Sequence, residues 1–177
     1  MPRPAVPSRR EDILKAARQA FSAQGFAGTR MEDIARRVGI SKASLYLQFA
    51  SKEALFEAAT VELIEAMLPQ VAPEDFGDIP AEQLLRGLIR AIAARLGEED
   101  MAFVPRVIIG EGMNFPELAR FYYEHAIARG LAVIERIIRH GMARGEFACA
   151  DPVHACRSVI GGVLVAAIWK RVFEPVG

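Results

Sequence analysis

The segment VGISKASLYLQF, residues 38–49, carries an apolar side chain, Leu47, at a position that helical spacing turns away from the core. If Leu45 and Phe49 face inward, the outward set is Lys42, Ala43, Ser44, Tyr46 and Leu47. These side chains suit a DNA major groove, where Lys meets guanine or phosphate, Ser and Tyr meet phosphate or a base edge, and Ala and Leu touch a thymine methyl. The segment therefore predicts a DNA-reading surface; the alternative is a solvated helical hairpin inside a larger bundle.

Phosphate contacts are expected on both sides of this segment. Lys52 lies beside the N–H groups that begin the next predicted helix, and Thr29 and Arg30 begin the preceding one. Residues 1–53 contain 10 Lys and Arg against 5 Asp and Glu, whereas the rest of the chain contains 12 against 17. A basic front and an acidic rear predict an anionic partner for the front only.

Capping residues predict four helices in the front part of the chain. The expected N-caps are Ser8, Thr29, Ser41 and Ser51, the first two in capping boxes with Glu11 and Glu32. Gly25 and Gly39 are expected to end the first two helices. A turn of about four residues around Gly39 then separates the second and third helices, which is helix-turn-helix spacing.

The rear part follows a break at PEDFGDIP, residues 73–80. Helical stretches are expected at about 80–96, 100–112, 114–144 and 151–173, and no strand pattern or repeat is found. The predicted fold is all-α. A three-helix DNA-binding domain at residues 1–53, with a loose arm at 1–7, is joined by a long helix to a helical domain at 54–177.

Composition excludes several other classes of protein. The chain has 177 residues, 52% of them hydrophobic, and two cysteines, which is too few for a disulfide scaffold. No Cys/His cluster has metal-ligand spacing, no Ser or Cys has a plausible His–acid pair, and no Gly-rich phosphate loop occurs. We therefore expect no enzyme, metal or cofactor.

No segment suggests a membrane location. The most apolar run, VIGGVLVAAIW at residues 159–169, is shorter than the roughly 20 residues that span a bilayer. The first 12 residues carry charge without an apolar region behind it, so no secretory signal is expected. The sequence predicts a cytoplasmic protein without a membrane partner.

Residues 8–56 resemble the DNA-binding domain of the TetR family of bacterial transcriptional repressors. A Phe–Gly segment, a Thr before "IA", a "GIS" turn, "LY", a Phe and "SKEAL" occur in the family's order. Gln48 stands where many members carry His or Tyr, a departure that bears on operator preference, and we include it in the DNA-binding set. The resemblance implies a homodimeric repressor whose rear domain binds a small molecule and thereby releases operator DNA.

Glu111 is the most informative residue of the rear part. It follows Val104, Val107 and Ile108 at helical spacing, which places a carboxylate on the apolar stripe of its helix. Because an unpaired buried carboxylate is costly, it needs a partner or a shifted pKa. Three alternatives remain open: a structural pair with Arg106 or another Arg, exposure at the helix end, or contact with a ligand.

In the third alternative, an apolar cavity holds a mostly hydrophobic inducer with one polar group. The predicted ligand-binding residues are Phe103, Val107, Glu111, Phe121, Tyr122, His125 and Trp169. For most of the apolar ones, a purely structural core role is the competing interpretation.

A two-fold dimer is expected because two recognition helices must reach successive major-groove turns. The last helix is the best candidate interface, through Ile160, Gly161, Val163, Leu164 and Ile168. The same residues could instead be buried core. The alternative function is a ligand-independent DNA-binding protein whose rear domain only dimerises.

Overall fold

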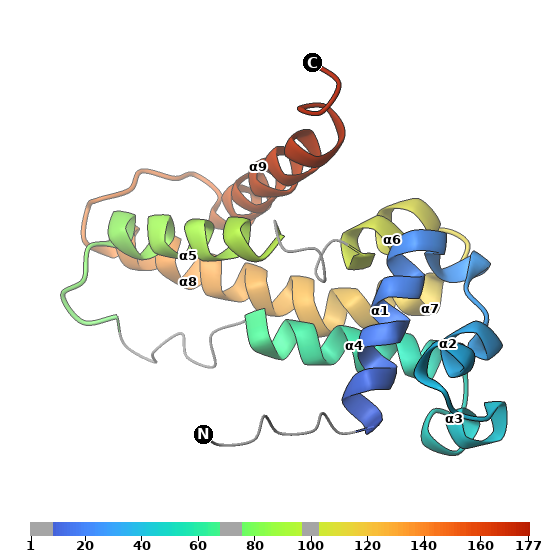
Figure 1. Cartoon of the computed structure of the whole chain (residues 1–177). Coiled ribbons are helices and arrows are strands. Elements are labelled where there is room, and N and C mark those ends of the chain that lie inside the picture. Colours follow the sequence, from blue (N-terminus) through green and yellow to red (C-terminus); the bar gives the residue numbers. More distant parts are fainter. Residues whose placement is uncertain (1–8, 68–75, 97–102) are drawn as a thin grey trace, which may run out of the picture. The chain divides into compact units, whose positions relative to one another are not determined.

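The computed structural model describes residues 9–67, 76–96 and 103–177, and within these ranges it contains helices and no strand (Figure 1). The elements are α1 (Arg9–Gly28), α2 (Met31–Val38), α3 (Lys42–Gln48), α4 (Lys52–Met67), α5 (Ala81–Leu96), α6 (Phe103–Glu111), α7 (Pro116–Tyr122), the π-helix η2 (Tyr123–Ile127), α8 (Ala128–Ala143) and α9 (Pro152–Val172). The predicted all-α fold is confirmed. The predicted arm at 1–7 and the Ser8 cap lie outside the described residues.

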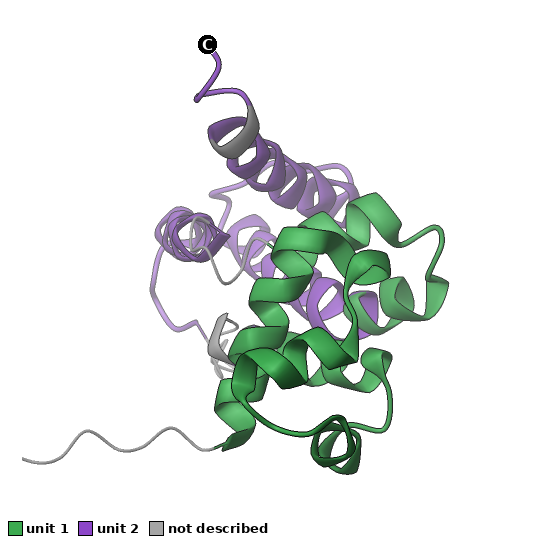
Figure 2. Cartoon of the chain, turned by 45° about the vertical axis from the view of Figure 1, so that its right-hand side comes forward, with its two compact units in different colours: residues 1–63, 102–122 green, residues 64–101, 123–177 purple. Residues whose placement is uncertain are grey.

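The chain packs into two compact units that are discontinuous in sequence (Figure 2). Unit 1 comprises residues 1–63 and 102–122, and unit 2 comprises residues 64–101 and 123–177. Packing thus places α6 and α7 with the N-terminal helices. The predicted boundary between residues 53 and 54 separates the DNA-binding domain from the rear helical domain by function and not by packing, and it stays a prediction.

Phenylalanine rings form the centre of unit 1. The rings of Phe21 and Phe26 in α1, Phe56 in α4 and Phe103 in α6 are fully buried. Their centroids lie 5.3–6.1 Å apart in stacked and edge-on pairs, and Phe115 meets Phe26 at 4.8 Å. Large apolar rings give the greatest stabilisation per residue on burial, so α1, α4 and α6 are held to one another.

The turn between α2 and α3 forms as the sequence predicts. Gly39 has φ 73° and ψ 36°, a left-handed conformation that favours glycine, and Ile40 N–H donates to Ala35 O at 3.0 Å. Ser41 caps α3, because its Oγ accepts from Ser44 N–H at 3.0 Å. The helix-turn-helix geometry is therefore set by local residues.

The predicted capping box at Thr29 is wrong. The N-cap of α2 is Arg30, in an extended conformation and without a side-chain cap bond. The Thr29 hydroxyl is buried and donates to Gly25 O at 2.6 Å. Gly25 itself has φ 74° and ψ −180°, which kinks α1 three residues before the helix ends. The Thr29 hydroxyl therefore stabilises the kink in α1 and does not cap α2.

Unit 2 is built from α5, α8 and α9. Among its described residues, the core includes a cluster of Phe76, Ala81 and Ile137 and a cluster of Ile134, Ile138 and Cys156. Asp151 caps α9 as predicted, accepting from His154 N–H at 3.0 Å. The helix predicted at 114–144 is observed as α7, η2 and α8, and the chain passes from unit 1 to unit 2 where η2 begins.

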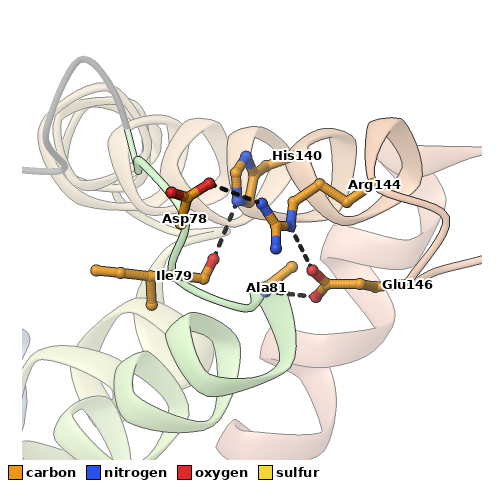
Figure 3. Close-up of polar contacts among 6 residues, drawn as sticks. All are labelled: Asp78, Ile79, Ala81, His140, Arg144 and Glu146. Carbon is orange, nitrogen blue, oxygen red and sulfur yellow. Dashed lines mark hydrogen bonds and ion pairs between the residues drawn. The ribbon is translucent and has the colours of Figure 1, made fainter.

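Polar contacts tie the start of α5 to the end of α8 (Figure 3). Ala81 N–H donates to Glu146 Oε2 at 2.6 Å, and Arg144 Nε donates to Glu146 Oε1 at 2.5 Å. His140 Nε2 lies 3.1 Å from Ile79 O. The hydrogen bond from Arg144 is the main reason why the pKa of Glu146 lies below its usual value.

Candidate nucleic-acid interface

Helix α3 presents the face that the sequence predicts. Leu45 and Phe49 are buried, whereas Ala43 is exposed, the Tyr46 side chain is 41% exposed and Leu47 is 88% exposed. Of the other predicted residues, Lys42 and Gln48 are exposed and Ser44 is half-buried. Leu47 therefore lies on the surface together with Ala43, Tyr46 and Gln48, and this face is available to a partner.

Lys42 already has an ionic partner. Its ammonium pairs with the Glu32 carboxylate of α2 and lies 5.7 Å from the Tyr46 ring centroid. The hydrogen bond between Lys42 and Glu32 raises the pKa of Lys42 and lowers that of Glu32. Both groups are exposed, so the pair is weak and a phosphate or base edge can replace the carboxylate.

The residues predicted to contact phosphate differ in whether their polar groups already make internal hydrogen bonds. Arg30 is exposed at the start of α2. The Thr29 hydroxyl is buried on Gly25 O, as described above. Lys52 Nζ donates to Phe26 O at 2.7 Å and to Thr29 O at 3.1 Å, and lies 4.4 Å from the Phe26 ring centroid. Phosphate contact by Thr29 and Lys52 stays a prediction, and it competes with these internal bonds.

Glu111 finds partners that the sequence does not indicate. Its Oε1 accepts from Phe26 N–H at 2.8 Å and its Oε2 accepts from Ala27 N–H at 2.7 Å. Arg106, the expected ionic partner, instead donates to Ser22 O. Glu111, the last residue of α6, therefore binds the end of α1, and Arg106, earlier in α6, binds α1 at Ser22.

The predicted ligand residues of unit 1 belong mainly to its packing. Phe103 and Val107 are buried on α6, and Phe121 is half-buried on α7. Tyr122 is buried, and this burial raises the pKa of its phenol to about 12. Ligand contact by Phe103 or Val107 would require the core of unit 1 to open.

The predicted ligand residues of unit 2 are both exposed. His125 lies in η2 and Trp169 lies near the end of α9. The Trp169 side chain is 58% exposed, and its ring centroid lies 5.0 Å from that of Phe173. Ligand contact by His125 and Trp169 stays a prediction.

The predicted dimer residues are divided between the core and the surface of unit 2. Val163 is buried, and Ile160 packs against the cluster around Cys156. Gly161 and Leu164 are half-buried, and Ile168 is exposed. The larger apolar surface lies further along α9 and beyond it: Val165, Ile168, Trp169, Phe173 and Val176.

Other chemistry finds no support in the residues that the structure describes. They contain no group of three His, Cys, Asp or Glu residues placed to hold a metal ion. Cys149 and Cys156 are free thiols, and burial raises the pKa of Cys156, which disfavours the reactive thiolate.

Family comparisons match both parts of the chain. Residues 13–59 match the model described as bacterial regulatory proteins, tetR family, and residues 83–175 match the model of the AefR-like transcriptional repressor C-terminal domain. The transcriptional regulator RutR of Escherichia coli K12 is 40% identical over 79 residues, which are 44% of this chain and 37% of RutR. The chain thus spans little more than a third of this curated relative.

Solved structures resemble the chain over most of its length. A crystal structure from Mesorhizobium loti, described as a TetR-family transcriptional regulator, is 29% identical with a TM-score of 0.67 and covers 94% of this chain and 84% of its own. The flavonoid-responsive regulator FrrA is 28% identical with a TM-score of 0.65, covering 90% and 85%. Both similarities cover at least 90% of the chain and therefore extend well beyond the helix-turn-helix.

Proposed function

The chain belongs to the TetR family of bacterial transcriptional regulators, and we propose that it is a homodimeric repressor released from its operator by a small, mostly hydrophobic inducer. Its relatives are DNA-binding regulators and not enzymes, which confirms the prediction of a non-enzymatic protein. We propose, beyond family membership, that this chain represses transcription, forms a dimer and responds to an inducer.

The observation that carries the DNA-binding proposal is the exposed face of α3. Leu47 and Ala43 offer apolar contact to thymine methyl groups, and Tyr46 and Ser44 offer hydroxyls to base edges or phosphates. Gln48 adds an amide that suits adenine. The recognition helix would enter the major groove with Arg30 of α2 on the adjacent phosphate backbone.

We place the dimer contact on the exposed apolar surface of α9. This surface centres on Val165, Ile168 and Trp169, and the glycine pair before it allows close approach of a partner helix. By length and composition, residues 152–170 could also cross a membrane, whereas the curated relatives are HTH-type transcriptional regulators. A second copy of the chain in the cytoplasm is the occupant that fits a two-fold operator.

The inducer is proposed by analogy with a regulator of similar structure. The similar regulator FrrA is described as flavonoid-responsive, and a flavonoid is an aromatic molecule with a few polar groups, as the predicted pocket would require. Phe121, half-buried on α7, is the aromatic candidate that the core of unit 1 encloses least, and His125 is an exposed candidate of unit 2. Binding must favour a conformation with lower DNA affinity.

Two measurements test these proposals. Selection of bound duplexes from a random pool should enrich an inverted repeat, as a two-fold repressor requires. A thermal-shift screen that includes flavonoids should then yield hits that weaken binding to the selected duplex. Hits that bind without changing DNA affinity would favour the alternative, a ligand-independent DNA-binding protein whose rear domain only dimerises.

A further inference from the structure

We infer that Glu111 of α6 is a positioning residue for DNA recognition: its carboxylate fills an anion site at the α1–α2 corner, residues 25–30, and so sets the entry into the helix-turn-helix. The inference rests on the proposed function, because its readout is operator affinity. Helix α6 would thus help to position the helix-turn-helix, a role that the sequence pattern of neither residues 1–53 nor residues 54–177 indicates.

The anion site arises from the kink at Gly25. The backbone of Gly25 is non-helical, and the N–H groups of Phe26 and Ala27, directly after it, donate to a side chain from α6. The two oxygens of Glu111 accept one N–H each, at 2.8 and 2.7 Å. A carboxylate bound by two backbone N–H groups makes charge-assisted bonds, which are stronger than neutral ones.

The opposite side of the corner is held by a cation. Lys52 of α4 donates to Phe26 O at 2.7 Å, to Thr29 O at 3.1 Å and to Ala27 O at 3.5 Å. The Thr29 hydroxyl closes the corner internally on Gly25 O. The N–H groups of one short segment are therefore bound by an anion from α6 and its C=O groups by a cation from α4.

Helix α6 packs against α1 and α4 through buried side chains, so it can fix the position of Glu111. Phe103 and Val107 are buried on it, and the Phe103 ring lies 6.1 Å from Phe21 and 5.8 Å from Phe56 between ring centroids. Arg106 adds a second bond to α1 through Ser22 O. Since the apolar core fixes α6 along α1, Glu111 at its end presents the carboxylate at one place.

The corner leads directly into the reading helices. Arg30 is both its last residue and the N-cap of α2. Helix α2 packs against α3, and Ile34 and Ala35 of α2 and Leu45 of α3 are buried. A loosened corner therefore lets α2 and α3 move as a pair while the residues that face DNA stay intact. The expected result is a weaker operator complex with an unchanged number of phosphate contacts.

The test compares Glu111→Ala and Glu111→Gln with Glu117→Gln, an exposed carboxylate in the first turn of α7. Operator affinity on the selected duplex should fall about tenfold or more in both Glu111 variants and stay unchanged in Glu117→Gln. The slope of affinity against salt should equal that of the wild type in all three. Circular dichroism at the assay temperature establishes that the variants are folded.

Acetate supplies the second arm of the test. The small carboxylate can occupy the vacated N–H pair of Glu111→Ala, so it should raise operator affinity relative to chloride at equal ionic strength, and should not do so in the wild type. Wild-type affinity in folded Glu111→Ala and Glu111→Gln, or equal effects of acetate and chloride, would overturn the inference. Failure of the wild type itself to select any duplex would instead contradict the proposed function.

Discussion

Gly25 leaves room for the carboxylate of Glu111: a Cβ at position 25 would lie 2.2 Å from Glu111 Oε1. The residue also has φ 74°, which disfavours any other amino acid. Glycine is therefore favoured at this kink by its own backbone conformation, and a Cβ there would also displace the carboxylate end of the Glu111 side chain from its observed place.

These two effects can be separated with Gly25→Ala. In the wild-type background we expect a loss of more than about 2 kcal/mol of unfolding free energy, from left-handed strain and the collision together. In a Glu111→Ala background the collision is absent, so the loss should shrink to about 1 kcal/mol. Urea denaturation of the four proteins measures both, and an equal loss in the two backgrounds would contradict the observed contact.

Lys52→Ala tests whether the Lys52 ammonium stabilises the α1–α2 corner or contacts a DNA phosphate. Because Lys52 Nζ binds backbone carbonyls of Phe26 and Thr29, we expect a loss of about 1–2 kcal/mol of stability and an unchanged salt slope of DNA binding. The phosphate contact predicted from the sequence would instead reduce the slope by about one unit. Thermal denaturation and a salt titration on the selected duplex distinguish the two roles.

Trp169→Asp should separate the dimer. A charge in the exposed apolar surface of α9 would be buried without a partner when two copies associate, which is costly. Light scattering at micromolar concentration should then report monomers, with the monomer's helical content unchanged. Val153→Asp is the matched control, since Val153 is 43% exposed in the first turn of the same helix, outside that surface. A dimeric Trp169→Asp protein would move the interface elsewhere.

Glu146→Gln should make stability less dependent on acid. The hydrogen bond from Arg144, aided by Ala81 N–H, keeps the pKa of Glu146 below the usual 4.5, so its stabilising contribution is complete above that pH and is lost as pH falls through the folded-state pKa. The variant should therefore melt below the wild type at pH 7, and the difference should narrow below pH 4.5. Glu174→Gln, an exposed residue after α9, should show neither effect.

Local patterns in the sequence predict most of the recognition module. The inward Leu45, the outward Leu47, the left-handed Gly39 and the Ser41 cap all follow from spacing within a dozen residues. The helix ends of the rear part agree with the prediction within a few residues for α5 and α9. Short-range rules suffice here because the determining contacts are close in sequence.

The α1–α2 corner was beyond such rules. Glu111 and Phe26 are 85 residues apart, and nothing in the spacing of α6 indicates that its carboxylate binds backbone N–H groups. The available signals were an acidic residue on an apolar stripe and Gly25, which the sequence predicts as the end of the first helix, whereas α1 continues past it to Gly28. The capping box predicted at Thr29 is wrong for a similar reason, because the Thr29 hydroxyl donates to Gly25 O and does not cap α2. The π-helix η2 likewise interrupts a pattern that reads as one continuous helix.

The measurement that tests the central claim most directly is duplex selection with the wild type and with Leu47→Ala, followed by titration of both proteins on the wild-type consensus. Leu47 is almost fully exposed on the proposed recognition helix, so the variant should keep its melting temperature while its enriched sequence changes at one symmetric pair of base positions. Its affinity for the wild-type consensus should fall about fivefold or more. An identical enriched sequence bound with identical affinity would contradict the account that α3 reads the operator through this face.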